Sequence, residues 1–114
     1  MKIIPSNKTK SFRDLVVWQK AHQLVLKVYQ ATRSFPKSEQ YGLISQVRRS
    51  SISIAANISE SYKKKTTPSK LNYLNIAEAS LEETKYYFIL SKDLEWIEEK
   101  EFYTLNSLSE EIGK

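Results

Sequence analysis

Apolar residues recur at helical spacing along most of this chain, and few residues in it are able to end a helix. Its 114 residues include only two glycines and three prolines, the residue types that tight turns most often require. Long helices joined by short links are therefore expected, and the length is sufficient for one domain with its own core. The sequence predicts an all-α fold in which residues 11–114 form a single antiparallel up-down-up-down four-helix bundle.

The first two helices are delimited by capping residues and one proline. Ser11 and Asp14 have the spacing of a capping box, with Asp in place of the usual Glu, and are expected to begin the first helix. Pro36 disfavours helical geometry at the residue before it, so the first helix should end near residue 34. Ser38 is then expected to cap the second helix, which should extend to the lysines at 63–65.

The third helix is predicted over about residues 67–94, with Thr67 as its cap and Pro68 at its first position. Apolar residues lie on nearly all of its sides, a pattern typical of a deep interior or of a subunit interface. A chain of this size has little deep interior, so we expect copies of it to associate. The fourth helix, about 99–112, is the shortest and ends near the last residue, so a partner or further residues should complete its packing.

Residues 46–60 carry two competing patterns. Read alone, Ser51-Ile52-Ser53-Ile54 alternates as a strand would, whereas on a 3.6-residue period the apolar residues of the whole stretch share one face. The alternation stops at Ala55, and helical patterns flank it on both sides, so we predict a helix. A second face of that helix is polar and forms what we name the polar stripe: Gln46, Arg49, Ser53, Asn57 and Glu60.

The polar stripe allows three interpretations. Its residues would fix helix register and subunit number, as buried polar groups do in coiled coils, or contact nucleic acid through Arg48 and Arg49, or line a small-molecule site. If packing buries the stripe, Arg49 must be paired, because breaking a buried ion pair costs about 3–5 kcal/mol. Glu60, in the same chain or in a neighbouring copy, is the expected partner.

Charge is divided between the two halves of the chain. Residues 1–70 hold 14 Lys and Arg against 3 Asp and Glu, whereas residues 71–114 hold 4 against 10. This asymmetry predicts a basic surface for polyanions, attraction between the basic and acidic surfaces of neighbouring copies, or a surface that is merely well solvated. Residues 1–10 show no sustained period and are expected to form a flexible basic arm.

The candidate nucleic-acid contacts lie in the basic half. Three of these cations are spaced seven residues apart and should align along the outside of the first helix. The lysines at 63–65 suit the carbonyl end of the second helix as well as they suit phosphate. Few aromatic residues are interleaved with the cations, so base stacking is not supported. The full candidate set is Arg13, Lys20, Lys27, Arg48, Arg49, Lys63, Lys64 and Lys65.

The sequence lacks the residues that several catalytic and metal-binding chemistries require. Without cysteine there is no disulfide framework or thiol nucleophile, and His22, expected to be partly buried, is the only histidine. A bundle di-iron site requires Glu-x-x-His pairs, so Glu78, Glu82 and Glu83 are interpreted as an exposed acidic face. No phosphate loop or Ser/His/Asp set is present. We therefore predict a protein without enzymatic activity, metal or cofactor.

The same sequence argues against a membrane location. No apolar run approaches the ~20 residues that a membrane span requires, and the beginning of the chain is too polar for a signal peptide. A cytoplasmic location is expected.

Taken together, the spacing resembles that of a bacterial four-helix bundle family named after proteins encoded in intervening sequences of 23S ribosomal RNA genes. The resemblance covers nearly the whole chain after the basic arm, with departures at Ser61 and Ala79, where the family usually has glycine. The residues that carry it are Phe12-Arg13-Asp14-Leu15, Trp18, Ala21, Phe35-Pro36, Glu39, Gly42-Leu43, Gln46, Arg48-Arg49, Ser53-Ile54, Asn57-Ile58, Glu60, Ala77 and Ser80-Leu81.

The resemblance implies a bundle that assembles into a ring-like homopentamer with no established enzymatic activity. It also implies similarity to the accessory variability proteins of diversity-generating retroelements, which are basic pentameric barrels that bind nucleic acid and a reverse transcriptase. Arg48, Arg49, Asn57 and Glu60 would then be the family-like polar residues. The expected function is non-catalytic binding of RNA or DNA by an oligomer; a scaffold for a protein partner is the alternative.

Overall fold

The computed structural model describes Met1 and residues 9–114, and in these residues it is all-helical with no strand. Residues 2–8, most of the predicted basic arm, lie outside the described part. The prediction of an all-α chain with four long helices is confirmed. The helices are α1 (Val16–Thr32), α2 (Leu43–Lys63), α3 (Thr67–Asp93) and α4 (Glu99–Gly113), with short 3-10 turns η1 (Phe12–Asp14) and η2 (Lys37–Glu39) before α1 and α2.

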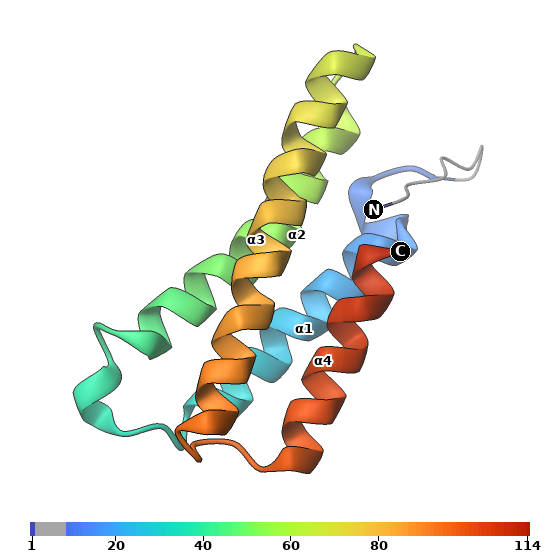
Figure 1. Cartoon of the computed structure of the whole chain (residues 1–114). Coiled ribbons are helices and arrows are strands. Elements are labelled where there is room, and N and C mark those ends of the chain that lie inside the picture. The colour runs from blue at the N-terminus through green and yellow to red at the C-terminus, as the bar shows by residue number, and fades with distance from the viewer. Residues whose placement is uncertain (2–8) are drawn as a thin grey trace.

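Each helix packs against two others. The α2–α3 contact is the most extensive, and α1 packs against both α2 and α4, while α4 also contacts α3. Figure 1 shows α2 and α3 as a long hairpin whose linked end extends beyond α1 and α4. The molecule is accordingly elongated, with dimensions of 44 × 24 × 18 Å. The arrangement is consistent with a four-helix bundle.

The capping box at Ser11 is confirmed, but it caps η1 and not the long helix. Ser11 Oγ accepts from the backbone N–H of Arg13 at 3.1 Å, and Asp14 Oδ2 accepts from those of Lys10 and Ser11 at 2.9 and 3.2 Å. These backbone amides, Lys10 first, hold the pKa of Asp14 below its usual value. Leu15 then adopts an extended conformation and is buried, so the predicted continuous helix is wrong and α1 begins at Val16.

The predicted start of the second helix is also wrong. Ser38 lies inside η2, where the amides of Glu39 and Gln40 donate to the carbonyls of Pro36 and Lys37 at 2.9 and 3.1 Å. Because these residues already form a tight 3-10 turn, the chain turns once more through Gly42 before α2 begins at Leu43. The end of α2 at Lys63 agrees with the prediction.

The cap of α3 is displaced by one residue from its predicted position. Thr66 is extended and its Oγ1 accepts from the backbone N–H of Ser69 at 3.3 Å, which makes it the cap in place of Thr67. Pro68 consequently occupies the second position of the helix. Two adjacent threonines before a proline offer the same chemistry, so the sequence pattern does not distinguish them.

We expect Thr66→Ala to lower the free energy of unfolding by about 1 kcal/mol, because it leaves a helix N-terminus without its side-chain acceptor. Thr67→Ala, the matched control, should change it by less than about 0.5 kcal/mol, because an exposed first-turn threonine makes no such bond. Chemical denaturation at one protein concentration measures both. A larger loss for Thr67→Ala would contradict the assignment.

The core confirms most of the predicted apolar faces. The apolar repeat of the second helix predicts a core face made of Leu43, Ile44, Val47, Ile54 and Ile58, and all five are buried. On α3 the apolar residues are divided between two environments: Ala77, Leu81 and Phe88 are buried, whereas Ile76, Tyr86 and Ile89 are exposed. On α4, Leu105, Leu108 and Ile112 are buried and Phe102 is half-buried. The apolar repeat of the first helix predicts a seam that includes Trp18 and Val25 and leaves Leu24 outside. This prediction is partly wrong, because Leu24 is fully buried at 0% exposure, whereas Trp18 and Val25 are only half-buried.

Candidate functional site

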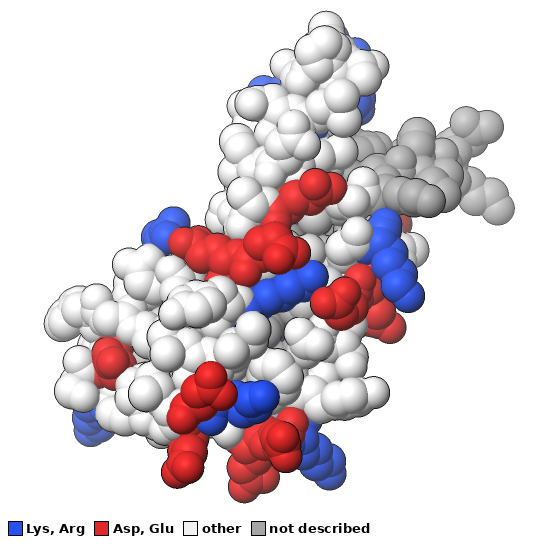
Figure 2. Space-filling model, viewed as in Figure 1, with Lys and Arg blue, Asp and Glu red and all other residues white. Residues whose placement is uncertain are grey.

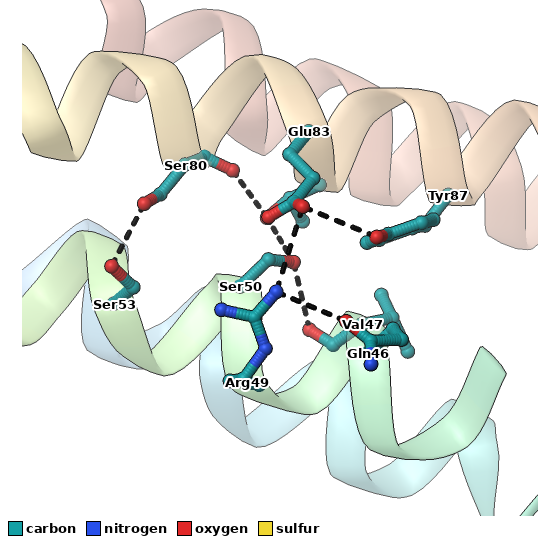
Figure 3. A network of polar contacts seen from close by, with 9 residues as sticks. Gln46, Val47, Arg49, Ser50, Ser53, Ser80, Glu83 and Tyr87 are labelled. Carbon is teal, nitrogen blue, oxygen red and sulfur yellow. Dashed lines mark hydrogen bonds and ion pairs between the residues drawn. The ribbon is translucent and has the colours of Figure 1, made fainter. Parts of the chain in front are cut away.

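The polar stripe of α2 lies along the edge of its contact with α3 (Figure 3). Ser53 Oγ and Ser80 Oγ are 2.8 Å apart across the two helices. Asn57 donates from Nδ2 to the carbonyl and to the hydroxyl of Ser53, at 2.8 and 3.1 Å. Ser53 and Asn57 are half-buried, whereas Gln46, Arg49 and Glu60 are exposed. The stripe is therefore a helix–helix seam with an exposed charged border.

A second polar pair lies deeper in the same seam and was not among the predicted site residues. Ser50 Oγ and Thr84 Oγ1 are 2.8 Å apart, and both residues are fully buried. Each hydroxyl also reaches a backbone carbonyl of its own helix, that of Val47 at 3.2 Å and that of Ser80 at 2.7 Å. Small hydroxyl residues at helical spacing were visible in the sequence, but their partners are set by how α2 packs on α3.

Arg49 is paired across the seam, and not with Glu60. Its Nη2 lies 3.6 Å from Glu83 Oε2 and donates to Gln46 Oε1 at 3.0 Å. Within one chain the predicted Arg49–Glu60 pair is wrong, because eleven residues along a helix correspond to roughly 16 Å. Glu60 instead lies 4.0 Å from Lys64 Nζ, one helical turn away.

Glu83 has a second partner in this network. The hydroxyl of Tyr87 donates to Glu83 Oε2 at 3.2 Å. Partial burial and the nearby Glu83 carboxylate both disfavour the phenolate and raise the pKa of Tyr87. At neutral pH the hydroxyl is therefore a donor, and Glu83 joins Arg49 and Tyr87 at the outer edge of the α2–α3 seam (Figure 3).

Because the Arg49–Glu83 pair is exposed, we expect its loss to have little effect on the fold. The side chains are 60% and 40% exposed, and such pairs contribute about 0–1 kcal/mol. Arg49→Ala should therefore change the free energy of unfolding by less than about 1 kcal/mol, similar to the exposed control Arg33→Ala. A loss of several kcal/mol in chemical denaturation, confined to Arg49→Ala, would show that the stripe is required for folding.

The candidate cations do not form one patch. Lys27 lines an open groove between α1 and α4 with Glu98 and Glu101. Arg13 is exposed on η1, and Lys20 is partly exposed on α1. Lys63 and Lys65 are exposed at the far end of α2, where Lys64 Nζ lies 5.0 Å from the centre of the Tyr73 ring.

Arg48 is held more firmly than the other cations. Its Nε donates to the hydroxyl of Thr32 at 2.9 Å, and its guanidinium carbon lies 4.3 Å from the centre of the Tyr29 ring. Thr32 is buried and itself donates to the carbonyl of Val28 at 2.8 Å. The arginine therefore connects α2 to α1 while remaining partly exposed.

Negative charge predominates on α3 and α4. Figure 2 shows acidic side chains spread over the face that these two helices form. Lys85 lies among them, 3.2 Å from both Glu82 Oε1 and Glu110 Oε1. Partial burial alone would lower the pKa of Lys85, but the hydrogen bonds from its ammonium group to the two carboxylates outweigh it and raise the pKa. Glu78 and Glu82 are exposed, as predicted, and Glu83 is half-buried.

The residues that other chemistries would require are dispersed. In the described residues no three His, Cys, Asp or Glu side chains come close enough together to hold a metal ion. The prediction that His22 is partly buried is wrong: it is exposed and stacks on Trp18 with ring centres 5.1 Å apart. No helix in the described part of the chain is both long and apolar enough to cross a membrane.

These features define a class: a small helical bundle with a hydroxyl-rich α2–α3 seam and opposite charges on its two halves. The chain belongs to the 23S rRNA-intervening sequence protein family, whose model matches residues 13–114. The predicted family membership is thus confirmed. Of the two departures from the family pattern, Ser61 is buried and donates to the carbonyl of Ile58 at 2.7 Å, whereas Ala79 is exposed.

A solved structure supports the same fold. The chain is similar to a crystal structure of a protein of unknown function from the S23 ribosomal protein family of Bacteroides thetaiotaomicron, with 28% sequence identity and a TM-score of 0.79. The match covers 85% of this chain and 91% of that protein. Among curated proteins, none matches this sequence.

Proposed function

We propose that this protein is a non-catalytic, oligomeric bundle that binds nucleic acid through a basic surface made of the dispersed cations of α1, α2 and the lysines at 63–65. The observation that carries the proposal is the separation of charge. Of the 18 Lys and Arg residues of the chain, 14 lie in residues 1–70 and only 4 in residues 71–114. Most of those in the described part are exposed, so they are available to phosphate.

Binding through phosphate contacts would show little preference for a particular nucleotide sequence. Lysine and arginine side chains contact the nucleic-acid backbone without reading bases, so affinity should depend strongly on salt and weakly on sequence. The family name refers to 23S ribosomal RNA. The expected resemblance to accessory variability proteins, a prediction from the sequence, also favours a nucleic-acid partner. Duplex DNA and structured RNA are therefore the first ligands to test.

The proposal includes an antiparallel up-down-up-down topology and assembly into a ring, with five subunits implied by the family resemblance. Short helix links and contacts between each pair of consecutive helices support the topology. Many large apolar side chains remain exposed, which supports self-association. They include Val16, Leu26, Tyr29, Tyr41, Ile52, Leu71, Ile76, Tyr86, Ile89, Leu94 and Tyr103.

Opposite charges support a particular kind of assembly. The acidic α3–α4 surface of one copy attracts cations of the next, and a repeated contact between two different surfaces closes into a ring when its rotation allows. The cations that this contact leaves exposed are the ones available to phosphate. The proposal also includes the cytoplasmic location and the lack of enzymatic activity that the sequence predicts.

Two measurements test the proposal. Light scattering of the purified chain should give a molar mass several times the 13.3 kDa of one copy. Fluorescence anisotropy at low salt should detect binding to duplex DNA and to a structured RNA of similar length. A stable monomer at micromolar concentration would contradict the oligomer, and an absence of binding at low salt would contradict the nucleic-acid function.

A scaffold without nucleic-acid binding is the second candidate, and one observation favours it. Arg49 and Lys64, two of the predicted phosphate contacts, already lie within 4.0 Å of carboxylates of their own chain. Arg49→Ala separates the two candidates. A smaller oligomer with unchanged affinity for nucleic acid would indicate an assembly role, whereas weaker binding by an intact oligomer would indicate phosphate contact.

A further inference from the structure

Two tyrosines and two arginines that are separated in the sequence meet in one shallow groove where α1 ends and α2 begins. The groove holds about 440 Å³ and lies between the C-terminal half of α1 and the first turns of α2. Its aromatic and charged lining residues are Tyr29, Tyr41, Arg48 and Arg49, with Ser45 and Ile52 beside them; we name it the Tyr–Arg groove. None of the described residues that line it carries a carboxylate.

We propose that the Tyr–Arg groove binds single-stranded nucleic acid by stacking a base on the Tyr41 ring while its arginines contact phosphate. This inference rests on the proposed function and names the form of nucleic acid and the place where it binds. It also revises the expectation from the sequence that aromatic residues are scarce among the cations, because the fold brings together residues from α1, the η2–α2 link and α2.

Tyr41 is the strongest single indication. Its side chain is 90% exposed, in the short link before α2, so it contributes almost nothing to the core. An aromatic ring left in water beside two arginines has a free π face, and every base has a π face that can stack on it. Such stacking depends little on the identity of the base.

Arg48 is prepared for this role by its surroundings. The Thr32 hydroxyl and the Tyr29 ring fix its guanidinium group before any ligand arrives, at 2.9 and 4.3 Å. A fixed side chain loses less conformational entropy on binding than a free one. Arginine planes also stack on bases in single-stranded RNA, in addition to pairing with phosphate.

Arg49 supplies the second charge at the outer side of the groove. It is 60% exposed even with Glu83 3.6 Å away, so a phosphate can still reach it. Binding to a duplex requires only cations. An aromatic ring and arginines in one basic groove suit a strand whose bases are unpaired. The acidic α3–α4 surface of a second copy is the other conceivable occupant, and the test below distinguishes it.

The test compares the affinities of a short oligouridylate and a duplex of equal length, by fluorescence anisotropy at low salt. Tyr41→Ala should weaken binding of the single strand by about 5- to 100-fold and change duplex binding by less than about twofold. Tyr41→Phe, which keeps the ring, should bind as the wild type does. Tyr103→Ala is the matched control, because Tyr103 is 73% exposed but lies on α4, away from the groove.

The outcomes separate this inference from the proposed function. If the wild type binds the single strand and Tyr41→Ala binds it equally well, the groove is not the site, although nucleic-acid binding stands. If the wild type binds neither ligand at low salt, both proposals fail. If Tyr41→Ala lowers the molar mass of the oligomer while affinity for the single strand is kept, the groove is a contact between copies and the inference is overturned.

Discussion

Ile54→Ala should lower the free energy of unfolding by about 2–5 kcal/mol, whereas Ile52→Ala should lower it by less than about 1 kcal/mol. The two residues have the same side chain and stand two positions apart in α2. Ile54 is 0% exposed in the core, and Ile52 is 43% exposed on the outer surface. Removing the buried Ile54 side chain loses all of its burial and leaves a cavity, whereas removing that of Ile52 loses less burial and leaves no cavity.

This pair also tests the secondary structure of the stretch that most resembled a strand. In a strand, residues two apart point to the same side, so both substitutions would have similar effects. In a helix they point nearly opposite ways, which is the arrangement observed. Denaturant unfolding should be compared at one protein concentration, because association makes the apparent stability of an oligomer depend on concentration. Equal losses for the two variants would contradict the helix.

Raising the salt concentration from about 50 mM to about 200 mM should weaken duplex DNA binding by roughly 10³-fold. Two of the eight candidate cations, Arg49 and Lys64, have carboxylates within 4.0 Å. If the other six each release one counterion from B-form DNA, the logarithm of affinity falls with the logarithm of salt with a slope of about −5.4. Fluorescence anisotropy over a salt series gives this slope directly.

A pair of double variants identifies which cations are responsible. Lys63→Ala with Lys65→Ala should make the slope less steep by about 1.8, because two phosphate contacts are lost. Lys100→Ala with Lys114→Ala removes the same charge from the region of α4 and should leave the slope unchanged. Equal changes in both would show that net charge, and not a particular surface, governs binding.

Local signals predicted the helices better than they predicted the helix ends. The repeat of apolar residues correctly places four helices and the buried face of α2. The starts of α1 and α2 were wrong because Leu15 is extended and η2 occupies the residues around Ser38. Caps and short 3-10 turns differ in energy by about 1 kcal/mol or less, so tertiary packing decides between them.

The candidate site was predicted only in outline. The polar stripe was identified from its spacing, yet the partner of Arg49 is Glu83, 34 residues later in the chain, and not Glu60. The buried Ser50–Thr84 pair and the Tyr–Arg groove were not predicted at all. Each depends on which faces of two different helices are in contact, and periodicity within one helix carries no information on that choice.

The sequence alone determined what depends on neighbours along the chain: helix content, the divided charge, the absence of cysteine and the family. Only the tertiary structure decided which side chains from different helices meet, because that depends on helix rotation and packing over distances that no local pattern encodes. The polar stripe therefore became a seam against α3, and Tyr29 and Tyr41, unremarkable in the sequence, came to lie beside Arg48.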